Sequence, residues 1–250
     1  MKVAICQPTY LPWLGYFDLM DQVDRFVLLD NVQFEKQSWQ QRNRIKTPTG
    51  LQWLTVPVVF RGRLNQMIRD VEVRETDFAR THLRALEISY GRAPFFSRFF
   101  PQFASSLQEV KAGARLLDLN LRLLKWITAA LGVSTSLVLA SSLNVEGKRT
   151  QLLSNICQRL VATEYISPIG SAEYLLQELP ILEDARVKTT FHNYVHPQYQ
   201  QRFPPFIPFA SVIDLIFNEG ERAMEIIRSG RRVPLTSEQV DGRMTEVKEA

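Results

Sequence analysis

Short runs of consecutive apolar residues alternate with helix-like stretches along most of the chain. Residues 2–6 form one apolar run and residues 25–30 form another, which ends in Asp30. Between them, the apolar side chains of residues 14–23 are spaced to cover one side of a helix. A strand, a turn, a helix and a second strand make a βαβ unit, and strands that are apolar throughout are typical of a parallel sheet. The start of the chain therefore predicts a parallel α/β sheet.

The same order continues to about residue 230, interrupted by two insertions. Residues 39–46 and 51–58 flank a Pro-Thr-Gly turn and predict a β-hairpin within an insertion at about 36–60. Helical spacing then dominates a segment at about 77–131. The expected elements are helices at 77–90, 96–107, 116–131 and 150–161, strands at 136–140, 164–166 and 187–195, and a helix that Ser211 caps.

We therefore expect a single α/β domain at 1–230, with a mainly parallel, Rossmann-like sheet flanked by helices. The chain length of 250 residues lies at the upper end of single-domain size. Residues 231–250 have little apolar periodicity, so we expect them to be a flexible C-terminal tail.

The composition of the chain limits the cellular compartment and the classes of partner that we expect. The chain has only two cysteines, which is typical of a reducing compartment and predicts a cytoplasmic protein. Residues 1–6 are too short for a signal-peptide core, and no apolar run approaches the ~20 residues of a membrane span. The formal charge of +4 helps to hold an anionic small molecule. It falls short of the dense basic stripe of a nucleic-acid binder, so nucleic acid is not the expected partner.

The turn at 7–17 carries the strongest functional signal. It links the first predicted strand to the first predicted helix, the place where open α/β sheets bind ligands. An amide can donate a hydrogen bond there, aromatic rings can stack on a base or sugar, and a glycine lets a ligand approach the backbone. The residues of this turn that we expect to bind substrate are Gln7, Tyr10, Trp13, Gly15 and Tyr16. The alternative is a packed aromatic cluster.

A second candidate site follows the second predicted strand. Asp30 ends that strand, where a carboxylate can hold a ribose hydroxyl or carry a proton. Guanidinium and ammonium groups follow within one short segment, and such groups bind phosphates. The residues of this segment that we expect to bind substrate are Lys36, Arg42, Asn43 and Arg44. Alternation in a strand would place Arg42 and Arg44 on one face with Lys46, so the alternative is a solvated cationic surface.

Two histidines lie four residues apart near the last predicted strand. Helical zinc motifs use this spacing, but in a strand His192 and His196 would be about 13 Å apart, too far to share one ion. We therefore assign no metal site, and the sequence identifies no cofactor. Histidine titrates near neutral pH, so we take His196 as the catalytic base and Asp30 as a second catalytic residue. Cys6 lies in a buried strand, where a thiol is usually an inert hydrophobe.

One more cation precedes a predicted helix. Lys148 follows Gly147, and its ammonium group could join the helix backbone donors in binding phosphate. The upstream glycine of a P-loop is missing, so the motif itself is not present. Further along the chain, Ser171 and Tyr174 could face the same phosphate pocket as Lys148.

Four sequence blocks resemble a known family. They are Gln7-Pro8 with Tyr10-Leu11-Pro12-Trp13 and Gly15-Tyr16; Leu29-Asp30-Asn31-Val32-Gln33-Phe34 with Lys36; Arg42-Asn43-Arg44-Ile45-Lys46-Thr47 with Trp53-Leu54-Thr55-Val56-Pro57; and His196-Pro197 with Tyr199 and Gln201. In these blocks the chain is similar to the WbqC-like family, bacterial proteins associated with lipopolysaccharide O-antigen and other surface-sugar biosynthesis. The resemblance adds Gln33 and Tyr199 to the expected substrate-binding residues. Relatives often carry a histidine where this chain has Cys6.

The resemblance implies a transferase that acts on a nucleotide-activated sugar or other phosphate-bearing precursor in surface-glycan or secondary-metabolite biosynthesis. Nucleotidyl transfer and acyl or aminoacyl transfer are both consistent with these residues. One alternative is a non-catalytic subunit that binds the precursor and organises partner enzymes. Another is single-stranded nucleic-acid binding by Trp39 and Trp53, which predicts strongly salt-dependent binding to random oligonucleotides.

Overall fold

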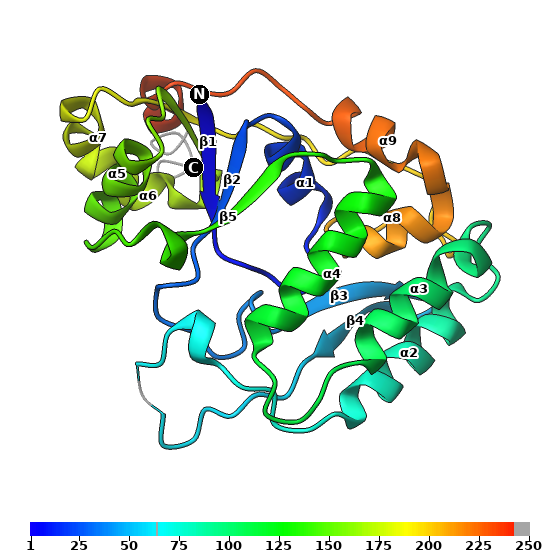
Figure 1. Cartoon of the computed structure of the whole chain (residues 1–250). Helices are drawn as coiled ribbons and strands as arrows, with labels where there is room; N and C mark the ends of the chain where they lie inside the picture. The colour runs from blue at the N-terminus through cyan, green and yellow to red at the C-terminus, as the bar shows by residue number, and fades with distance from the viewer. Residues whose placement is uncertain (64, 243–250) are drawn as a thin grey trace.

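The computed structural model describes residues 1–63 and 65–242 and contains a five-stranded parallel sheet (Figure 1). The strand order is β5-β2-β1-β6-β7, and every neighbouring pair is parallel. The strands are β1 (Lys2–Cys6), β2 (Arg25–Leu28), β5 (Ser136–Leu139), β6 (Glu164–Ser167) and β7 (Lys188–Phe191). The predicted Rossmann-like α/β class is confirmed.

The strand order reverses between β1 and β6. From β1 the chain builds outward through β2 to β5, and it then crosses over to form β6 and β7 on the other side of β1. The connections that leave the carboxyl ends of β1 and β6 therefore diverge from each other, which opens a crevice at this edge of the sheet. Open α/β sheets bind their ligands at such a switch point.

Alternate residues of the strands pack on opposite faces of the sheet. Val3 and Ile5 of β1 join one hydrophobic core, whereas Ala4 of β1 and Phe26 of β2 join a second, larger core. The helices over the first core are α5 (Arg149–Arg159), α6 (Ala172–Leu175) and α7 (Pro180–Asp184). Those over the second include α1 (Leu14–Asp21), α8 (Val212–Glu219) and α9 (Ala223–Ser229). Figure 1 shows the sheet between these two helical layers.

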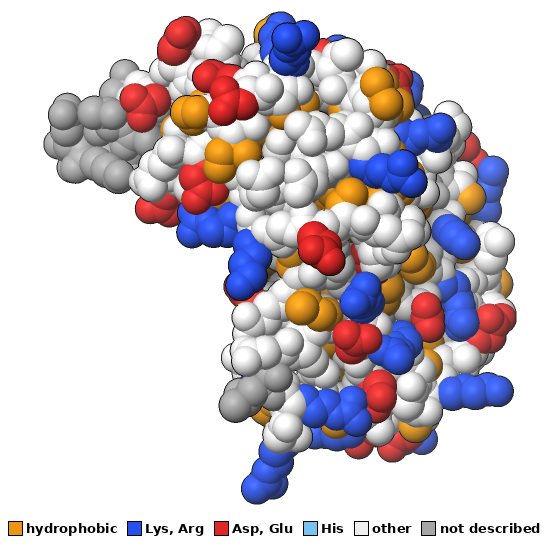
Figure 2. All heavy atoms as spheres, turned by 60° about the vertical axis from the view of Figure 1, so that its left-hand side comes forward, with side chains coloured by type: hydrophobic (Ala, Val, Ile, Leu, Met, Phe, Trp, Pro, Cys, Tyr) orange, Lys and Arg blue, Asp and Glu red, His pale blue; other side chains and the backbone are white. Residues whose placement is uncertain are grey.

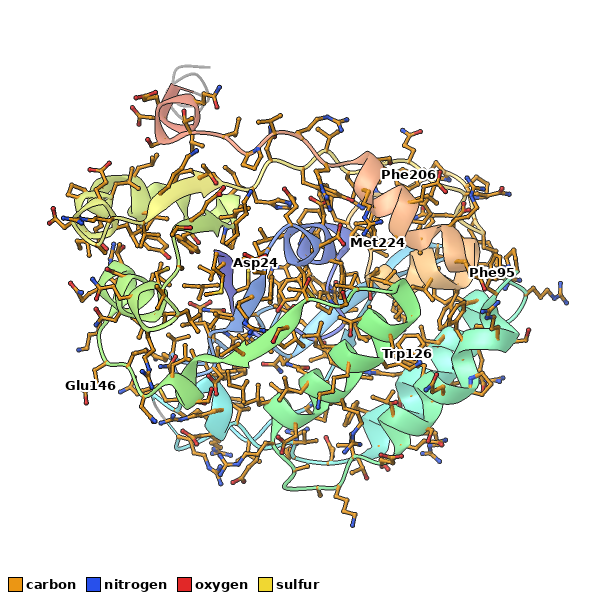
Figure 3. All side chains as sticks on the ribbon, turned by 45° about the horizontal axis from the view of Figure 1, so that its top comes forward. Asp24, Phe95, Trp126, Glu146, Phe206 and Met224 are labelled. Atoms are coloured by element: carbon orange, nitrogen blue, oxygen red, sulfur yellow. The ribbon has the colours of Figure 1, made fainter. Side chains whose placement is uncertain are left out.

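The hairpin and the inserted helices pack together below the sheet in the view of Figure 1. The hairpin strands are β3 (Arg42–Thr47) and β4 (Gly50–Thr55), and the helices are α2 (Asp77–Tyr90), α3 (Phe96–Gln108) and α4 (Leu116–Leu131). The rings of Trp126 in α4 and Phe103 in α3 pack edge to face with centroids 5.1 Å apart. Figure 3 shows Trp126 between these two helices. The core of this layer is rich in aromatic residues, and it is continuous with the larger core of the sheet.

Most predicted elements are present, with small differences at their ends. α2 and α4 have the predicted bounds, whereas the strand expected at 187–195 covers only Lys188–Phe191. The sequence did not predict α6 and α7. These helices have four and five residues, so they are too short to show a helical period.

Residues 231–242 differ from the flexible tail that we predicted. Leu235 is buried and exchanges two backbone hydrogen bonds with Phe191, of 2.8 and 2.9 Å. Val240 is also buried, in the same core as the helices α5 to α7. The segment is therefore attached to the edge of the sheet at β7. Residues 243–250, the rest of the predicted tail, lie outside the described residues.

Two features of the described residues bear on the partners of the protein: the hydrophobicity of the helices and the distribution of charge on the face in Figure 2. Within residues 1–63 and 65–242, no helix has the length and apolar character that crossing a bilayer requires. Figure 2 shows Lys and Arg side chains interspersed with Asp and Glu side chains. The positive net charge is therefore spread over this face and is not concentrated there.

Candidate functional site

A cavity of about 550 Å³ lies at the switch point between β1 and β6, and we call it the switch-point cavity. Its walls come from the end of β1, the opening turn, the turn after β6 and the residue that directly follows β7. Its polar and aromatic side chains include Gln7, Trp13, Tyr16, Ser171, Tyr174 and His192. The cavity thus occupies the edge of the sheet where the fold class binds ligands.

His192 is fixed at this cavity by three contacts. Its backbone N–H donates to the carbonyl of Ser167, at the end of β6, over 2.8 Å. Its Nε2 lies 2.8 Å from Oδ2 of Asp18, a fully buried residue of α1. Its ring stacks on the ring of Tyr194, with centroids 5.7 Å apart. These contacts hold the imidazole in one orientation beside the cavity.

The other partners of Asp18 all donate to its carboxylate, which identifies the role of Nε2 of His192. Nε of Arg231 donates to Oδ1 of Asp18 over 2.8 Å, and Nε2 of Gln22 donates to Oδ2 over 2.7 Å. A carboxylate can only accept, so Nε2 of His192 donates to Asp18, and in the neutral imidazole the lone pair then lies on Nδ1. A histidine oriented in this way by a carboxylate can take a proton from a bound ligand.

Two hydroxyl-bearing side chains line the same cavity, and one guanidinium lies against the second of them. Ser171 and Tyr174 both line it, whereas Lys148, with which the sequence grouped them, does not. The guanidinium of Arg149 lies over the Tyr174 ring, 5.3 Å from its centroid, and pairs with Glu178 at 2.9 Å. Cys6 also lines the cavity, and burial raises the pKa of its thiol above the ordinary value. At neutral pH Cys6 is therefore a thiol and not a nucleophilic thiolate.

The opening turn contributes most of its predicted residues to the cavity. Gln7, Trp13, Gly15 and Tyr16 line it. Tyr10 does not: its side chain is fully buried, and its hydroxyl is hydrogen-bonded to Nδ1 of His82 at 2.9 Å. No face of the Tyr10 ring is open for a ligand to stack on.

Gly15 has a different role from the one we expected. A Cβ atom at this position would collide with the indole of Trp13. The missing side chain therefore makes room for Trp13, where we had expected it to make room for a ligand. Trp13 in turn lines the cavity, so Gly15 shapes the wall indirectly.

A second, smaller cavity of about 270 Å³ adjoins the first, and we call it the aromatic cavity. The two cavities share four lining residues, Thr9, Trp13, Tyr16 and Trp39. Asn43 and Arg44 of β3 also line the aromatic cavity. Nδ2 of Asn43 donates to the carbonyl of Leu11 over 2.6 Å, which attaches the hairpin to the opening turn.

The other predicted cations do not converge on either cavity. The ammonium of Lys36 lies 3.9 Å from the centroid of the Phe60 ring, and the guanidinium of Arg42 lies 4.2 Å from that of Trp53. Lys148 is exposed immediately before α5. Lys46, which the alternative of a solvated cationic surface would leave exposed, is only 2% exposed. Of the predicted phosphate-binding cations, Arg44 alone lines one of these two cavities.

Asp30 lies outside both cavities, although it follows a strand at the ligand-binding edge. Its carboxylate accepts hydrogen bonds from the backbone N–H and the hydroxyl of Ser141, at 2.9 and 2.5 Å. Ser141 follows β5, the strand farthest from the switch point on that side. Gln33 is exposed and donates to Asn65 over 3.2 Å. The structure therefore separates Asp30 and Gln33 from His192.

His196 and Tyr199 belong to an aromatic cluster that packs against Trp13. The ring of His196 is stacked with those of Trp13 and Tyr199, with centroids 6.2 and 6.3 Å apart. Its Nδ1 faces the carbonyl of Pro197 at 2.9 Å, and burial lowers its pKa below the ordinary value. The hydroxyl of Tyr199 donates to the buried carboxylate of Asp214 over 2.6 Å. His196 thus contacts Trp13, but it is not among the residues that line either cavity.

The pair of Asp18 and His192 was not among the residues that the sequence nominated. His192 lies inside the strand predicted at 187–195 and directly follows the observed strand β7, which is a usable signal once β7 is known to neighbour β6 at the switch point. Asp18 lies in the first helix and shows no distinguishing pattern. Among the described residues, no group of three His, Cys, Asp or Glu side chains could hold a metal ion.

Comparisons with known proteins identify the same family as the sequence blocks. The model of the WbqC-like protein family matches residues 7–226. Uncharacterized protein Rv1507c of Mycobacterium tuberculosis (strain ATCC 25618 / H37Rv) is 39% identical over 232 residues, which cover 92% of this chain and 99% of the relative. No solved structure matches the chain.

Proposed function

We propose that this protein, which belongs to the WbqC-like protein family, is a transferase that acts on a nucleotide-activated sugar or another phosphate-bearing precursor in surface-glycan or secondary-metabolite biosynthesis. The observation that carries the proposal is the pair of Asp18 and His192 at the switch-point cavity. A cavity at this edge of the sheet supplies the binding site, and the pair supplies a base.

His192 is the base in this proposal. A hydroxyl or amine of the acceptor gives its proton to Nδ1 of His192 while its oxygen or nitrogen bonds to the electrophilic centre of the donor. The bond from that centre to the leaving group breaks, and the leaving group keeps the electron pair. Asp18 stabilises the imidazolium that forms, because its carboxylate already accepts from Nε2. Nucleotidyl and acyl or aminoacyl donors satisfy the same scheme.

This assignment departs from the sequence prediction of His196 and Asp30 as catalytic residues. Of the two histidines, His192 lines the cavity, whereas Nδ1 of His196 faces a backbone carbonyl. The carboxylate of Asp30 is bonded to Ser141. Two guanidinium groups support a phosphate-bearing substrate, Arg149 beside Tyr174 and Arg44 in the adjoining cavity.

The test is turnover by the purified protein on a panel of nucleotide sugars, with and without magnesium and acyl donors. On a substrate that turns over, His192→Asn should lower kcat by about 100- to 10,000-fold, the range for loss of a general base. The nucleotide-sugar Kd should change by less than about threefold, because the cavity keeps its shape. Asp18→Asn should lower kcat in the same direction.

His196→Asn is the matched control, since it removes the neighbouring histidine. A larger loss of kcat in His196→Asn than in His192→Asn would overturn the assignment of the base. Saturable binding of nucleotide sugars without turnover anywhere on the panel would instead favour a non-catalytic subunit that binds the precursor for partner enzymes.

A further inference from the structure

We infer that the aromatic cavity is a separate subsite that binds a planar ring carrying a carboxylate or a phosphate group. Five of its lining side chains carry rings, and the other three are those of Arg44, Asn43 and Thr9. The binding of such a ligand is independent of His192. Its role as the second reactant of the transferase rests on the proposed function.

The apolar wall fits a ring. Pro12, Trp13, Tyr16, Trp39 and Phe209 line the cavity, and the rings of Trp13 and Phe209 lie with centroids 5.5 Å apart. A cavity of roughly 150 Å³ with apolar walls is enough to bind benzene. The aromatic cavity, at about 270 Å³, has room for one such ring together with a substituent. Aromatic side chains stack on planar ligands in offset or edge-on arrangements.

The polar wall has donors without acceptors. Nε of Arg44 and Oγ1 of Thr9 are buried, and neither has a hydrogen-bond partner within the described residues. Buried polar atoms are nearly always paired, and these two belong to residues that line an open cavity, where a ligand atom can pair with them. Nε of Arg42 also has no partner within the described residues, but Arg42 lines neither cavity. A guanidinium and a hydroxyl both donate, and a carboxylate or phosphate oxygen accepts from both. The anionic group of the ligand therefore belongs beside Arg44 and Thr9.

Asn43 explains why this wall is preformed. Its Nδ2 donates to the carbonyls of Tyr10 and Leu11, and its Oδ1 accepts from the backbone N–H of Arg44 over 2.7 Å. These bonds occupy Asn43 itself, so the open donors are those of its neighbours. They also hold β3 against the opening turn, which keeps Arg44 at the cavity without a ligand.

Arg42 provides a matched control for Arg44. It lies two residues earlier on β3, and both guanidinium groups lie near the Trp53 ring, at 4.2 and 5.4 Å from its centroid. Arg44 lines the aromatic cavity, and Arg42 lines neither cavity. Replacing either residue removes one positive charge from the same face of the hairpin. A specific effect of Arg44 therefore separates the subsite from the general charge of this surface.

The experiment is a titration of the full chain, followed by tryptophan fluorescence and ligand-observed NMR. The probes are benzoate and phenyl phosphate, with phenol as the neutral ring and acetate and inorganic phosphate as anions without a ring. Benzoate or phenyl phosphate should bind saturably and at least about tenfold more tightly than the other three. The tighter of the two identifies the source of the anionic group.

Arg44→Gln should weaken the better probe by about tenfold or more, and Thr9→Val by a few-fold, whereas Arg42→Gln should leave its Kd within about twofold. Arg44→Lys keeps the charge but lacks the fork of donors, so it should also bind more weakly. It serves in place of Arg44→Gln if that variant does not fold. Equal Kd values for the Arg44 and Arg42 variants, or no saturable binding of either ring anion by the wild type, would overturn the inference.

The same probes separate this inference from the proposed function. His192→Asn should bind them as the wild type does, because His192 does not line the aromatic cavity. One outcome is that probe binding depends on Arg44 while turnover does not depend on His192. That outcome would contradict the assignment of His192 as the base and would support the subsite. Turnover that depends on His192 while the Arg44 variants bind the probes normally would do the reverse.

Discussion

The ends of β2 and β7 are each followed by a buried ionisable residue, yet the surroundings of the two residues differ. Asp30, after β2, accepts two hydrogen bonds from Ser141 and lies outside both cavities. His192, after β7, has one nitrogen bonded to Asp18 and lines the switch-point cavity. An ionisable residue at the end of a strand is therefore a functional candidate only where the strand order leaves space beside it.

The largest expected effect on stability comes from removing the carboxylate of Asp18 or that of Asp30. Asp18→Ala removes the partner of His192 and Arg231 inside the protein, so we expect the free energy of unfolding to fall by about 3–5 kcal/mol. Asp30→Ala leaves the Ser141 donors unpaired, and we expect a fall of about 1–3 kcal/mol. Urea titration followed by circular dichroism measures both. A greater loss in Asp30→Ala would invert the comparison.

A second test weakens the attachment of the C-terminal segment to β7. Leu235 is buried and pairs with Phe191, directly before His192. Leu235→Ala should lower the free energy of unfolding by about 2–3 kcal/mol through the cavity that it leaves. Val233 is 83% exposed, so Val233→Ala is the control and should change stability by less than about 0.5 kcal/mol. Similar values for both variants would contradict the observed packing.

A third test alters the wall of the switch-point cavity. Gly15→Ala adds a methyl group where the Trp13 indole lies, and overpacking of this kind costs about 1–3 kcal/mol. We expect a lower unfolding midpoint and a changed tryptophan emission, because Trp13 must move. Gly170 lines the same cavity and has open space around its Cβ position, so Gly170→Ala is the control. Identical midpoints for both variants would show that Trp13 adjusts without cost.

The smallest expected effect concerns Asp21, which neighbours the Asp18 pair. Burial acts to raise the pKa of Asp21, but hydrogen bonds from Arg228 and Arg231 outweigh it and hold the pKa below the ordinary 3.8. A lowered folded-state pKa stabilises the protein fully above the unfolded value, and this stabilisation is lost as the pH falls through the lower value. At pH 7, Asp21→Asn should cost about 1 kcal/mol, since Arg228 is exposed to solvent screening.

The pH dependence provides its own check. The difference in unfolding free energy between the wild type and Asp21→Asn should be constant above pH 5 and should shrink as the pH falls below 3.8. A difference that instead grows on acidification would mean that the pKa of Asp21 is raised in the folded protein.

Local patterns were enough to predict the parallel sheet and the position of the first turn that lines a cavity. Continuous apolar runs identified β1 and β2, and helical periods gave the bounds of α2 and α4. The opening turn contains four predicted residues that line the switch-point cavity. The same local patterns could not show that Tyr10 points into the core, because burial depends on what the hairpin and α2 place around it.

The sequence by itself determined that this chain is an α/β protein of the WbqC-like family whose first turn lies at the carboxyl edge of the sheet. Only the tertiary structure decided which ionisable groups meet at that edge. Asp18 and His192 are 174 residues apart in the sequence, and the position of β7 beside β6 brings them together. Arg231, which comes shortly after α9, also reaches Asp18 on α1. The period of apolar residues shows which side of each helix or strand is buried. The strand order and the packing between elements decide which distant side chains meet.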